Sequence, residues 1–420
     1  MYLAFTFVVI FYVADFFVLC ETNSNSHLHN DDDSKGDLLF VQLIFRHGDR
    51  TPLRFYENDP WKDPKYWEDD LGQLTNVGKR QIFELGLFMR ERYATFISET
   101  YSENDIYVQS SDIDRAIMSA EAFLAGMFLS NASVDIWKTY LPWTPIPVHT
   151  MPRHLDCLIL GSKSCAAYKE EFGNFIESEK IKEFNRKHKD LYDFLSLHSG
   201  NKVKKMDDCV PIWDALKIED AHNKTLPKWT EEIFPGGRFY DSIQEVTLNA
   251  FSVDTGTPFL AKIKGGFLLK DIFDRFTNKS KSILDPNRKL WVFSGHDTTI
   301  SRVLNTLGLL QVYPPVATCI IFEMRNIQNV PHVEMFIKNS TTAIPLQIPN
   351  CGLSCPLDKL YILYENILPA KSFEDECNVE KGMHSKASEN AVHFILQIAT
   401  FAVLLTQSLQ ASQSTIRLFY

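Results

Sequence analysis

The chain has 420 residues, roughly two or three domains by length alone, and its 45% hydrophobic composition allows a substantial core. Its formal net charge is −10 and its sequence pI is about 5.7. This acidic balance, without a basic stripe to displace counterions, argues against nucleic acid as a partner and leaves anionic ligands only where arginines gather locally.

The amino-terminal end predicts passage through the secretory pathway. Residues 1–20 are almost entirely apolar, contain no Lys or Arg and carry one charge, Asp15. We therefore predict a signal peptide at 1–20, with a membrane-spanning anchor as the alternative. Residues 21–36 are polar and acidic and are expected to form a disordered leader. Four Asn-X-Ser/Thr acceptor sites agree with glycosylation in that pathway: Asn131, Asn223, Asn278 and Asn339.

The first candidate site follows an apolar stretch at 38–45, which predicts a buried strand. The heptapeptide Arg-His-Gly-Asp-Arg-Thr-Pro comes directly after it and places His47 between Arg46 and Arg50. The two positive charges disfavour protonation of the imidazole and keep it nucleophilic, and two guanidiniums can hold a tetrahedral anion. A solvated ion-pair turn is the alternative for the tripeptide Arg-His-Gly alone, because short patterns recur by chance.

Two further elements are expected before residue 141. Thr75 is a good N-cap for a helix whose apolar stripe we assign to core packing. A short strand at 106–108 leads into a helical pattern that holds Arg115 in its first turn. A cation there opposes the helix dipole unless an anionic ligand offsets it. Arg115 is therefore a candidate anion-binding residue, although most exposed arginines are simply solvated.

The second candidate site lies far downstream. A second apolar strand at 290–293 runs into Ser-Gly-His-Asp-Thr-Thr, and a helical pattern follows. His296 and Asp297 therefore stand where a strand ends and a helix begins, the place where α/β sheets bind ligands and where a helix N-terminus attracts anions. Capping of that helix by Asp297 or Thr298 is the alternative role.

The two motifs resemble those of the histidine acid phosphatases, and the resemblance covers most of the chain after the leader. It implies that His47 is a nucleophile that becomes phosphorylated and that Asp297 protonates the leaving alcohol, its pKa being raised by the bound phosphate. The phosphate-binding residues that it implies are Arg46, Arg50, Arg115 and His296. The resemblance also implies a homodimer, and it requires neither a metal ion nor another cofactor.

The predicted fold is α/β: a mixed, mostly parallel sheet flanked by helices, with a smaller α-rich cap domain inserted. The catalytic domain is discontinuous and comprises residues 37–140 and 255–378. Residues 141–254 form the cap, because this region changes from proline-rich to charged and helical. The cap is expected to shape the cleft.

The sequence contains eight cysteines. Cys20 is expected to leave with the signal peptide, so that one of the remaining cysteines is unpaired or partnered between chains. The resemblance implies the disulfides Cys165–Cys377, Cys209–Cys319 and Cys351–Cys355 and leaves Cys157 as the odd thiol. Metal binding is the alternative, but the sequence has no paired Cys-X-X-Cys knuckles that would favour it.

The tail at 379–420 holds an apolar segment, 391–409, that Gln397 and Gln407 interrupt. This segment has about the minimum length for a bilayer span, so a membrane anchor and an amphipathic surface helix both stay open. The polar residues that follow it count against a lipid-anchor signal. The localisation that we expect is extracellular, lysosomal, or membrane-anchored with a lumenal catalytic domain.

The leading function is therefore an acid phosphatase that cleaves small phosphomonoesters or phosphoproteins. An inositol polyphosphate phosphatase shares both motifs, but it would need many additional Lys and Arg facing the cleft, and the sequence points to no such set. The third hypothesis is a catalytically weak secreted protein that binds phosphate or acts as an antigen. His47 and Asp297 argue against it, because a pure scaffold has no reason to keep a nucleophile and a proton donor at separate strand ends.

Overall fold

The computed structural model describes residues 36–129, 143–234 and 237–378. Of the features predicted above, the signal peptide at 1–20, nearly all of the leader, Asn131 and the apolar segment at 391–409 lie outside the described residues. No helix within the described ranges is long and apolar enough to cross a membrane.

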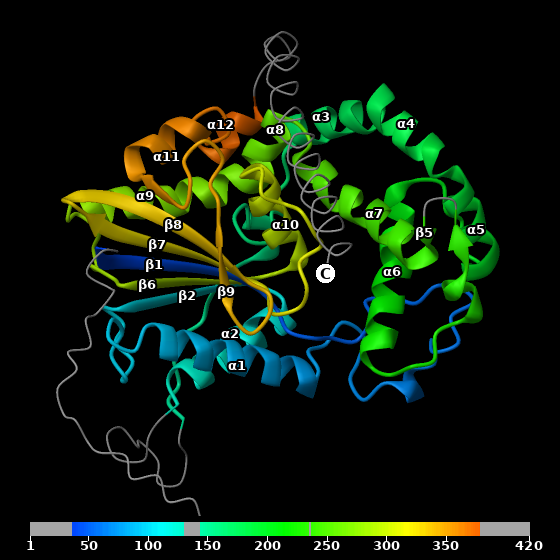
Figure 1. Cartoon of the computed structure of the whole chain (residues 1–420), viewed down its shortest axis with the longest axis horizontal. Coiled ribbons are helices and arrows are strands. Elements are labelled where there is room, and N and C mark those ends of the chain that lie inside the picture. The colour runs from blue at the N-terminus through cyan, green and yellow to red at the C-terminus, as the bar shows by residue number, and fades with distance from the viewer. Residues whose placement is uncertain (1–35, 130–142, 235–236, 379–420) are drawn as a thin grey trace, which may run out of the picture. The chain divides into compact units, whose positions relative to one another are not determined.

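A mixed sheet forms the centre of the described chain (Figure 1), in the order β10-β8-β7-β1-β6-β2-β3, with β9 pairing β8. The first strand, β1 (Asp37–Arg46), lies between a parallel and an antiparallel half. The parallel half consists of β6 (Leu290–Gly295), β2 (Ile106–Ser111) and β3 (His149–Met151). The antiparallel half consists of β7 (Cys319–Ile327), β8 (Val330–Lys338), β9 (Ala343–Leu346) and β10 (Ser354–Pro356). The predicted mixed sheet is confirmed, with a smaller parallel share than expected.

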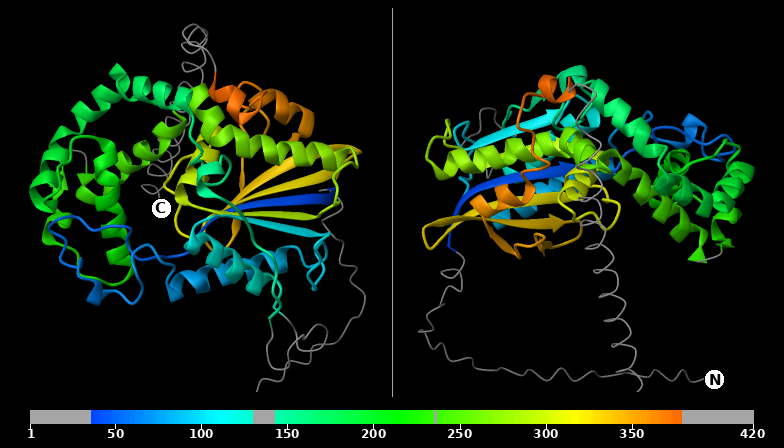
Figure 2. Two further views of the ribbon diagram at one scale, coloured as in Figure 1. Left: turned by 180° about the vertical axis from the view of Figure 1, so that it is seen from behind. Right: turned by 90° about the horizontal axis from the view of Figure 1, so that it is seen from above.

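Helices cover both faces of this sheet (Figures 1 and 2). One face packs against α1 (Asn76–Arg92) and α2 (Asp114–Met127). The other packs against α9 (Phe267–Ser280), α10 (Asp297–Thr306) and α11 (Leu357–Tyr364). The short helices α8 (Pro258–Ala261) and α12 (Phe373–Cys377) lie on the same side as α9. As predicted, Thr75 caps α1 by accepting a hydrogen bond from the backbone N–H of Gly78 at 3.1 Å.

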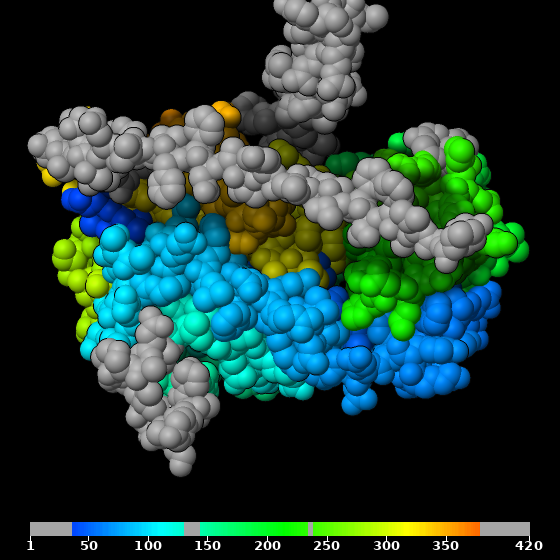
Figure 3. Space-filling view, turned by 60° about the horizontal axis from the view of Figure 1, so that its bottom comes forward, coloured from blue at the N-terminus to red at the C-terminus, as the bar shows by residue number. Residues whose placement is uncertain are grey.

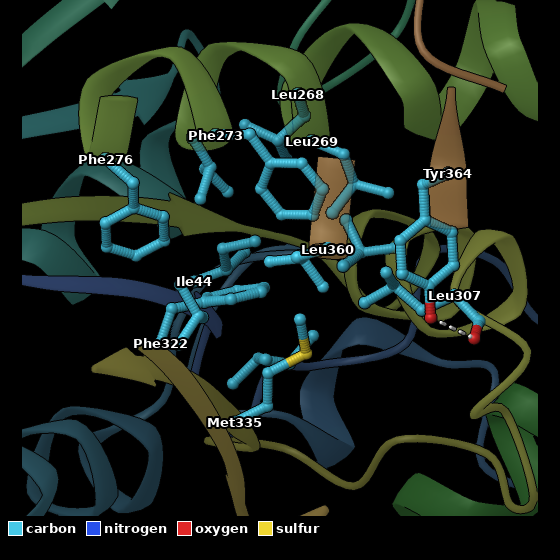
Figure 4. Packing of buried hydrophobic residues seen from close by; sticks show 14 of the residues in the cluster. Ile44, Leu268, Leu269, Phe273, Phe276, Leu307, Phe322, Met335, Leu360 and Tyr364 are labelled. Atoms are coloured by element: carbon cyan, nitrogen blue, oxygen red, sulfur yellow. Dashed lines mark hydrogen bonds between the residues drawn. The ribbon is translucent and has the colours of Figure 1, made fainter. Parts of the chain in front are cut away.

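The core owes its two layers to the alternation of β1. Because successive side chains of a strand point to opposite faces, Leu43 and Phe45 pack toward α1 and α2, whereas Phe40 and Ile44 pack toward α9 and α11. Figure 4 shows the second layer, in which Ile44 lies among the side chains of α9 and α11. Burial of these apolar side chains fixes the strand register and hence the position of the residue at which β1 ends.

A group of helices lies beside the sheet and has its own buried core (Figure 1). It consists of α3 (Ala166–Ile176), α4 (Glu179–Lys187), α5 (Lys189–Ser199), α6 (Met206–Ala221) and α7 (Phe239–Ser252), with the small hairpin β4 (Ile233–Phe234) and β5 (Gly237–Arg238). Tyr56, from the loop after β1, contributes to this core. In the space-filling view that loop, drawn in blue, lies against the green helical group (Figure 3). These helices occupy the region predicted as the cap, and its boundaries as a separate domain stay a prediction.

Two disulfides are formed in the described part of the chain, Cys165–Cys377 and Cys351–Cys355. The expected pair Cys209–Cys319 is wrong: both residues are free and buried. Cys209 packs inside the helical group, whereas Cys319 packs between the sheet and the layer of α1 and α2, so their side chains belong to different cores. Cys157 is free as expected, but it is one of three free thiols within the described residues rather than the only one.

Candidate active site

Three strand ends meet at one edge of the sheet. β1 and β6 are parallel neighbours in a register that pairs Arg46 with Gly295, and the backbone N–H of His47 donates to the carbonyl of Gly295 at 2.9 Å. The two candidate motifs are therefore adjacent, although some 250 residues separate them. β2 pairs with the other side of β6 and leads into α2, whose second residue is Arg115.

His47 is buried, with 1% of its surface exposed. Its Nδ1 lies 2.8 Å from the carbonyl oxygen of Gly48, which can only accept, so Nδ1 carries the ring proton and Nε2 keeps its lone pair. Burial lowers the pKa of His47 well below its usual value, and the charges of Arg46, Arg115 and Arg50 lower it further. The imidazole is therefore neutral, with an unprotonated Nε2, even at acid pH.

Gly48 has a packing role rather than the ligand-facing role that a glycine beside a binding site suggests. A Cβ at this position would lie 2.3 Å from the backbone oxygen of Gly78 in α1, and a Cβ at Gly78 would meet the backbone of Asp49 at 2.1 Å. Only a pair of glycines permits this close approach. The contact holds the motif loop against the start of α1.

Arg46 and Arg50 are both almost completely buried. Arg46 donates to the carbonyl of Pro314 at 2.5 Å and lies 3.1 Å from Asp297 Oδ2. Arg50 makes a two-pronged contact with Asp214, at 3.0 and 2.8 Å. The Nε atoms of both arginines are buried and have no hydrogen-bond partner within the described part of the chain. Buried donors without acceptors are costly, so this cluster of arginines is suited to an anionic ligand.

Arg115 and His296 complete the set. The Nε of Arg115 donates to Nε2 of His47 at 3.0 Å. Burial, with repulsion from Arg50, lowers the pKa of Arg115 to about 10, so it stays charged. His296 Nε2 lies 2.8 Å from Ser111 Oγ, and burial and the charge of Arg115 lower the pKa of His296 to about 3. His296 is therefore a neutral hydrogen-bonding group.

Asp297 begins α10 and is held by three groups. Its Oδ1 accepts from the backbone N–H of Thr298 at 2.7 Å, and its Oδ2 accepts from the hydroxyl of Tyr313 at 2.7 Å and contacts Arg46. Burial alone would raise the pKa of Asp297, but Arg46, Arg50, His47 and Tyr313 together hold it well below its usual range. The carboxylate is thus ionised in the ligand-free protein.

The predicted capping alternative at this helix is wrong. The N-cap of α10 is His296, whose backbone N–H donates to Thr299 Oγ1 at 3.1 Å, rather than Asp297 or Thr298. Oδ1 of Asp297 accepts from the backbone N–H of Thr298 within this helix, and Oδ2 makes the contacts across the site. The geometry places all six predicted side chains, those of Arg46, His47, Arg50, Arg115, His296 and Asp297, in one cluster.

Three further contributors lie outside the two motifs. Asp214, on α6, accepts two hydrogen bonds from the guanidinium of Arg50. Tyr313, in the loop between α10 and β7, donates a hydrogen bond to Asp297. His222, at the C-cap of α6, lies 2.9 Å from Asp49 Oδ2. Only His222 stands in a stretch, Ala-His-Asn-Lys-Thr-Leu-Pro, that resembles the acid phosphatases. The contacts of Asp214 and Tyr313 follow only from how the helical group packs.

The glycosylation sites predicted elsewhere in the chain remain predictions. Within the described ranges, no cluster of three or more His, Cys, Asp or Glu side chains could hold a metal ion. Asn223 and Asn339 are exposed, and Asn278 lies partly exposed on α9. These three sequons therefore lie at positions that solvent reaches.

Comparison with known proteins identifies relatives over most of the chain. Residues 37–337 match the histidine phosphatase superfamily (branch 2). Prostatic acid phosphatase of Bos taurus is 34% identical over 368 residues, covering 85% of this chain and 91% of the relative. Venom acid phosphatase of Apis mellifera is 32% identical over 355 residues, covering 81% and 90%. Lysosomal acid phosphatase of Rattus norvegicus is 32% identical over 358 residues, covering 81% and 80%.

The same fold is found in solved structures. The apo form of the phytase of Hafnia alvei has a TM-score of 0.61 at 19% identity, covering 82% of this chain and 98% of the phytase. Its complex with myo-inositol hexakis sulphate has a TM-score of 0.63 at 18% identity, covering 82% and 99%. At this level of identity the likeness establishes the fold alone.

Proposed function

Because this chain belongs to the histidine phosphatase superfamily (branch 2) and is an acid phosphatase, a phosphoric monoester hydrolase, we propose that it works through a covalent phosphohistidine on His47. The observation that carries the proposal is the neutral, buried His47, with its Nε2 lone pair turned toward Arg115 among three guanidiniums. Such a nucleophile is present at acid pH, where an ordinary histidine would be protonated.

In the first step a phosphate monoester binds among the arginines. Its oxygens replace the groups that accept hydrogen bonds from Arg50 and Arg115 in the ligand-free protein. The free Nε–H donors of Arg46 and Arg50 supply further contacts. The lone pair of His47 Nε2 forms a bond to phosphorus while the bond from phosphorus to the ester oxygen breaks. The guanidiniums stabilise the charge on the equatorial oxygens.

The leaving group takes a proton from Asp297. An alkoxide is a poor leaving group, so a placed acid should matter most for alkyl esters. Asp297 is ionised in the ligand-free protein, and a second negative charge beside it raises its pKa. We infer that the proton arrives with the substrate, either on a monoanionic ester or by uptake on binding. The acid preference follows from this proton rather than from His47.

In the second step water attacks phosphorus and the bond to Nε2 breaks. The carboxylate of Asp297, now deprotonated, accepts the proton of the attacking water. Inorganic phosphate leaves, and His47 returns to its neutral state. The cycle uses only side chains of this chain.

An inositol polyphosphate substrate is less well supported. Besides backbone carbonyls, the arginines contact two side chains beyond their own cluster, Asp214 and the ring of Tyr313, an acidic and an aromatic group. Neither would hold a further phosphate. Turnover of simple monoesters also separates the proposal from a phosphate-binding protein without activity.

We also infer that the enzyme acts in the secretory pathway, extracellular or lysosomal. The two disulfides and the solvent-reachable sequons support this placement. A membrane anchor at 391–409 and a homodimer stay proposals. Glycosidase treatment and gel filtration of protein made in a secretory host test glycosylation and dimerisation.

The decisive experiment traps the phosphoenzyme without acid, because phosphohistidine is acid-labile. Wild-type protein, His47→Ala and Asp297→Asn are mixed with a radiolabelled monoester and quenched with alkali. We expect label on the wild-type protein. His47→Ala should carry no label, and its activity should be lower by at least about a thousandfold. Labelling of Asp297→Asn should be slowed only when the substrate is an alkyl ester. Equal labelling of His47→Ala would exclude His47 as the nucleophile.

A further inference from the structure

Tyr313 contacts both halves of the active site from outside the two motifs. Its hydroxyl donates to Asp297 Oδ2 at 2.7 Å, and its ring lies under the guanidinium of Arg46 at 5.0 Å. Arg46 in turn contacts the same carboxylate oxygen. One phenol therefore fixes the proposed acid through its hydroxyl and a phosphate-binding arginine through its ring.

The helical group holds this phenol in place. The ring of Trp213, on α6, packs edge-on against Tyr313 with centroids 4.4 Å apart, and Phe251, on α7, packs at 4.9 Å. Trp213 precedes Asp214, whose carboxylate accepts two hydrogen bonds from Arg50. Two consecutive residues of α6 thus reach the two motifs by separate routes, Asp214 directly and Trp213 through Tyr313.

We propose that Tyr313 is a positioning residue for Asp297. Tyr313 holds the carboxyl group in place and makes it a stronger acid, and it narrows the pH range over which that acid carries its proton. The proposal rests on the role given to Asp297 above. A hydrogen bond donated to a carboxylate favours its ionised form. The same bond makes the protonated carboxyl readier to release its proton to the ester oxygen. The cost is that fewer molecules carry that proton as the pH rises.

The hydroxyl of Tyr313 adds to the effect of the surrounding charges on the pKa of Asp297. The groups that face Asp297 are Arg46, His47, Arg50, Arg115, His296 and Tyr313. Asp214 is the further charge that faces Tyr313. Burial, with Asp297 and Asp214 nearby, raises the pKa of Tyr313 well above its usual value despite the opposing charge of Arg46, so the phenol keeps its proton and donates it as a hydrogen bond. Replacement by Phe removes the hydroxyl and keeps the ring under Arg46.

The test compares wild type with Tyr313→Phe on an alkyl ester, glycerol phosphate, and on p-nitrophenyl phosphate. The nitrophenolate leaves without a proton, so only the alkyl ester reports on Asp297. For Tyr313→Phe on glycerol phosphate we expect kcat to fall about tenfold and its alkaline limb to move up by about one pH unit. On p-nitrophenyl phosphate we expect kcat within about twofold of wild type.

Tyr240→Phe is the matched control, because the hydroxyl of Tyr240 is buried and has no hydrogen-bond partner within the described residues. Tyr240→Phe should leave kcat and its pH dependence unchanged on both substrates. An equal loss on both substrates with an unmoved alkaline limb would overturn the proposal and leave Tyr313 a packing residue. An unchanged kcat and limb on glycerol phosphate would overturn it as well.

A second comparison separates failure of this inference from failure of the proposed mechanism. Asp297→Asn alone should reduce turnover of glycerol phosphate far more than turnover of p-nitrophenyl phosphate, and Tyr313→Phe should have no further effect in that background. If Asp297→Asn reduces both esters equally, Asp297 is not the acid. If it selectively reduces the alkyl ester but Tyr313→Phe still acts on top of it, Asp297 keeps its role and the link to Tyr313 is wrong.

Discussion

The Nε–H of Arg115 points at the lone pair of His47 Nε2, 3.0 Å away. In the ligand-free protein the proposed nucleophile is therefore hydrogen-bonded by a residue that is itself assigned to phosphate. Phosphate oxygens are stronger acceptors than a neutral imidazole, so a bound ester draws Arg115 away and frees the lone pair. We infer that substrate binding and release of the His47 lone pair are the same event.

Arg115→Ala should separate these two roles. Loss of a charge-assisted contact should weaken phosphate binding by roughly 10- to 100-fold. The freed imidazole should at the same time react faster with diethyl pyrocarbonate, measured by mass spectrometry of the peptide that contains His47. Arg80→Ala, which removes an exposed arginine of α1, is the control. Slower modification of His47 in Arg115→Ala would contradict the inference that the hydrogen bond from Arg115 blocks the Nε2 lone pair of His47.

Residues that act next to a strand end could be predicted from the sequence, because the strand, the motif and the following helix are local features. His47 and Asp297 are of this kind, and parallel pairing of β1 with β6 brings them together. Tyr313 could not be predicted, since its contact with Asp297 depends on a loop that the helical group packs against. The antiparallel strands β8 and β9 were likewise missed, because no pattern along the chain showed their pairing.

Affinity for inorganic phosphate should fall as the pH rises. Asp297 is ionised in the free protein, with a pKa held well below its usual range, so it repels a second negative charge on the ligand. The complex therefore holds a proton that free protein and dianion lack, and affinity should drop toward tenfold per pH unit above the second pKa of phosphate, roughly 6–7. Below the second pKa of phosphate, His47 stays neutral because its pKa is lowered, and the affinity for phosphate should not depend on pH.

Calorimetric titration across that range measures the effect, and Asp297→Asn tests its cause. The amide carries no charge, so the variant should bind the dianion without taking up a proton and show a flatter dependence. A pH dependence as steep as that of wild type would show that a group other than Asp297 takes the proton.

The cysteine variants should divide by their bonding. Cys165 and Cys377 are 212 residues apart, so their disulfide constrains a large part of the unfolded chain. Cys165→Ser should lower the free energy of unfolding by about 4 kcal/mol. Cys319→Ser should change it far less than that, because Cys319 is a free thiol and the serine is nearly isosteric. Urea unfolding of both variants under non-reducing conditions makes the comparison, and a large loss for Cys319→Ser would restore the discarded pair with Cys209.

A buried pair of carboxyl groups should make the enzyme less stable as the pH rises. Glu219 on α6 and Asp59 in the loop after β1 are 0% and 3% exposed. Burial and the charge of Asp59 raise the pKa of Glu219 to about 9, so the folded protein keeps a proton on this pair. The unfolded chain releases that proton above the ordinary pKa of Glu, near 4.3.

The sign follows from the proton count. Between an unfolded pKa near 4.3 and a folded pKa of about 9 the folded state binds more protons than the unfolded state, so stability is greatest at acid pH and declines through this window. The slope has an upper bound of about 1.4 kcal/mol per pH unit for one proton. Glu219→Gln keeps the shape of a protonated carboxyl group and cannot ionise, so its unfolding free energy should decline less steeply. Urea unfolding of wild type, Glu219→Gln and the exposed control Glu91→Gln at several values between about pH 5 and 8 measures these slopes. Identical slopes for wild type and Glu219→Gln would mean that the pair is not protonated in the folded enzyme and that α6 is held to the loop by packing and by the contact of His222 with Asp49.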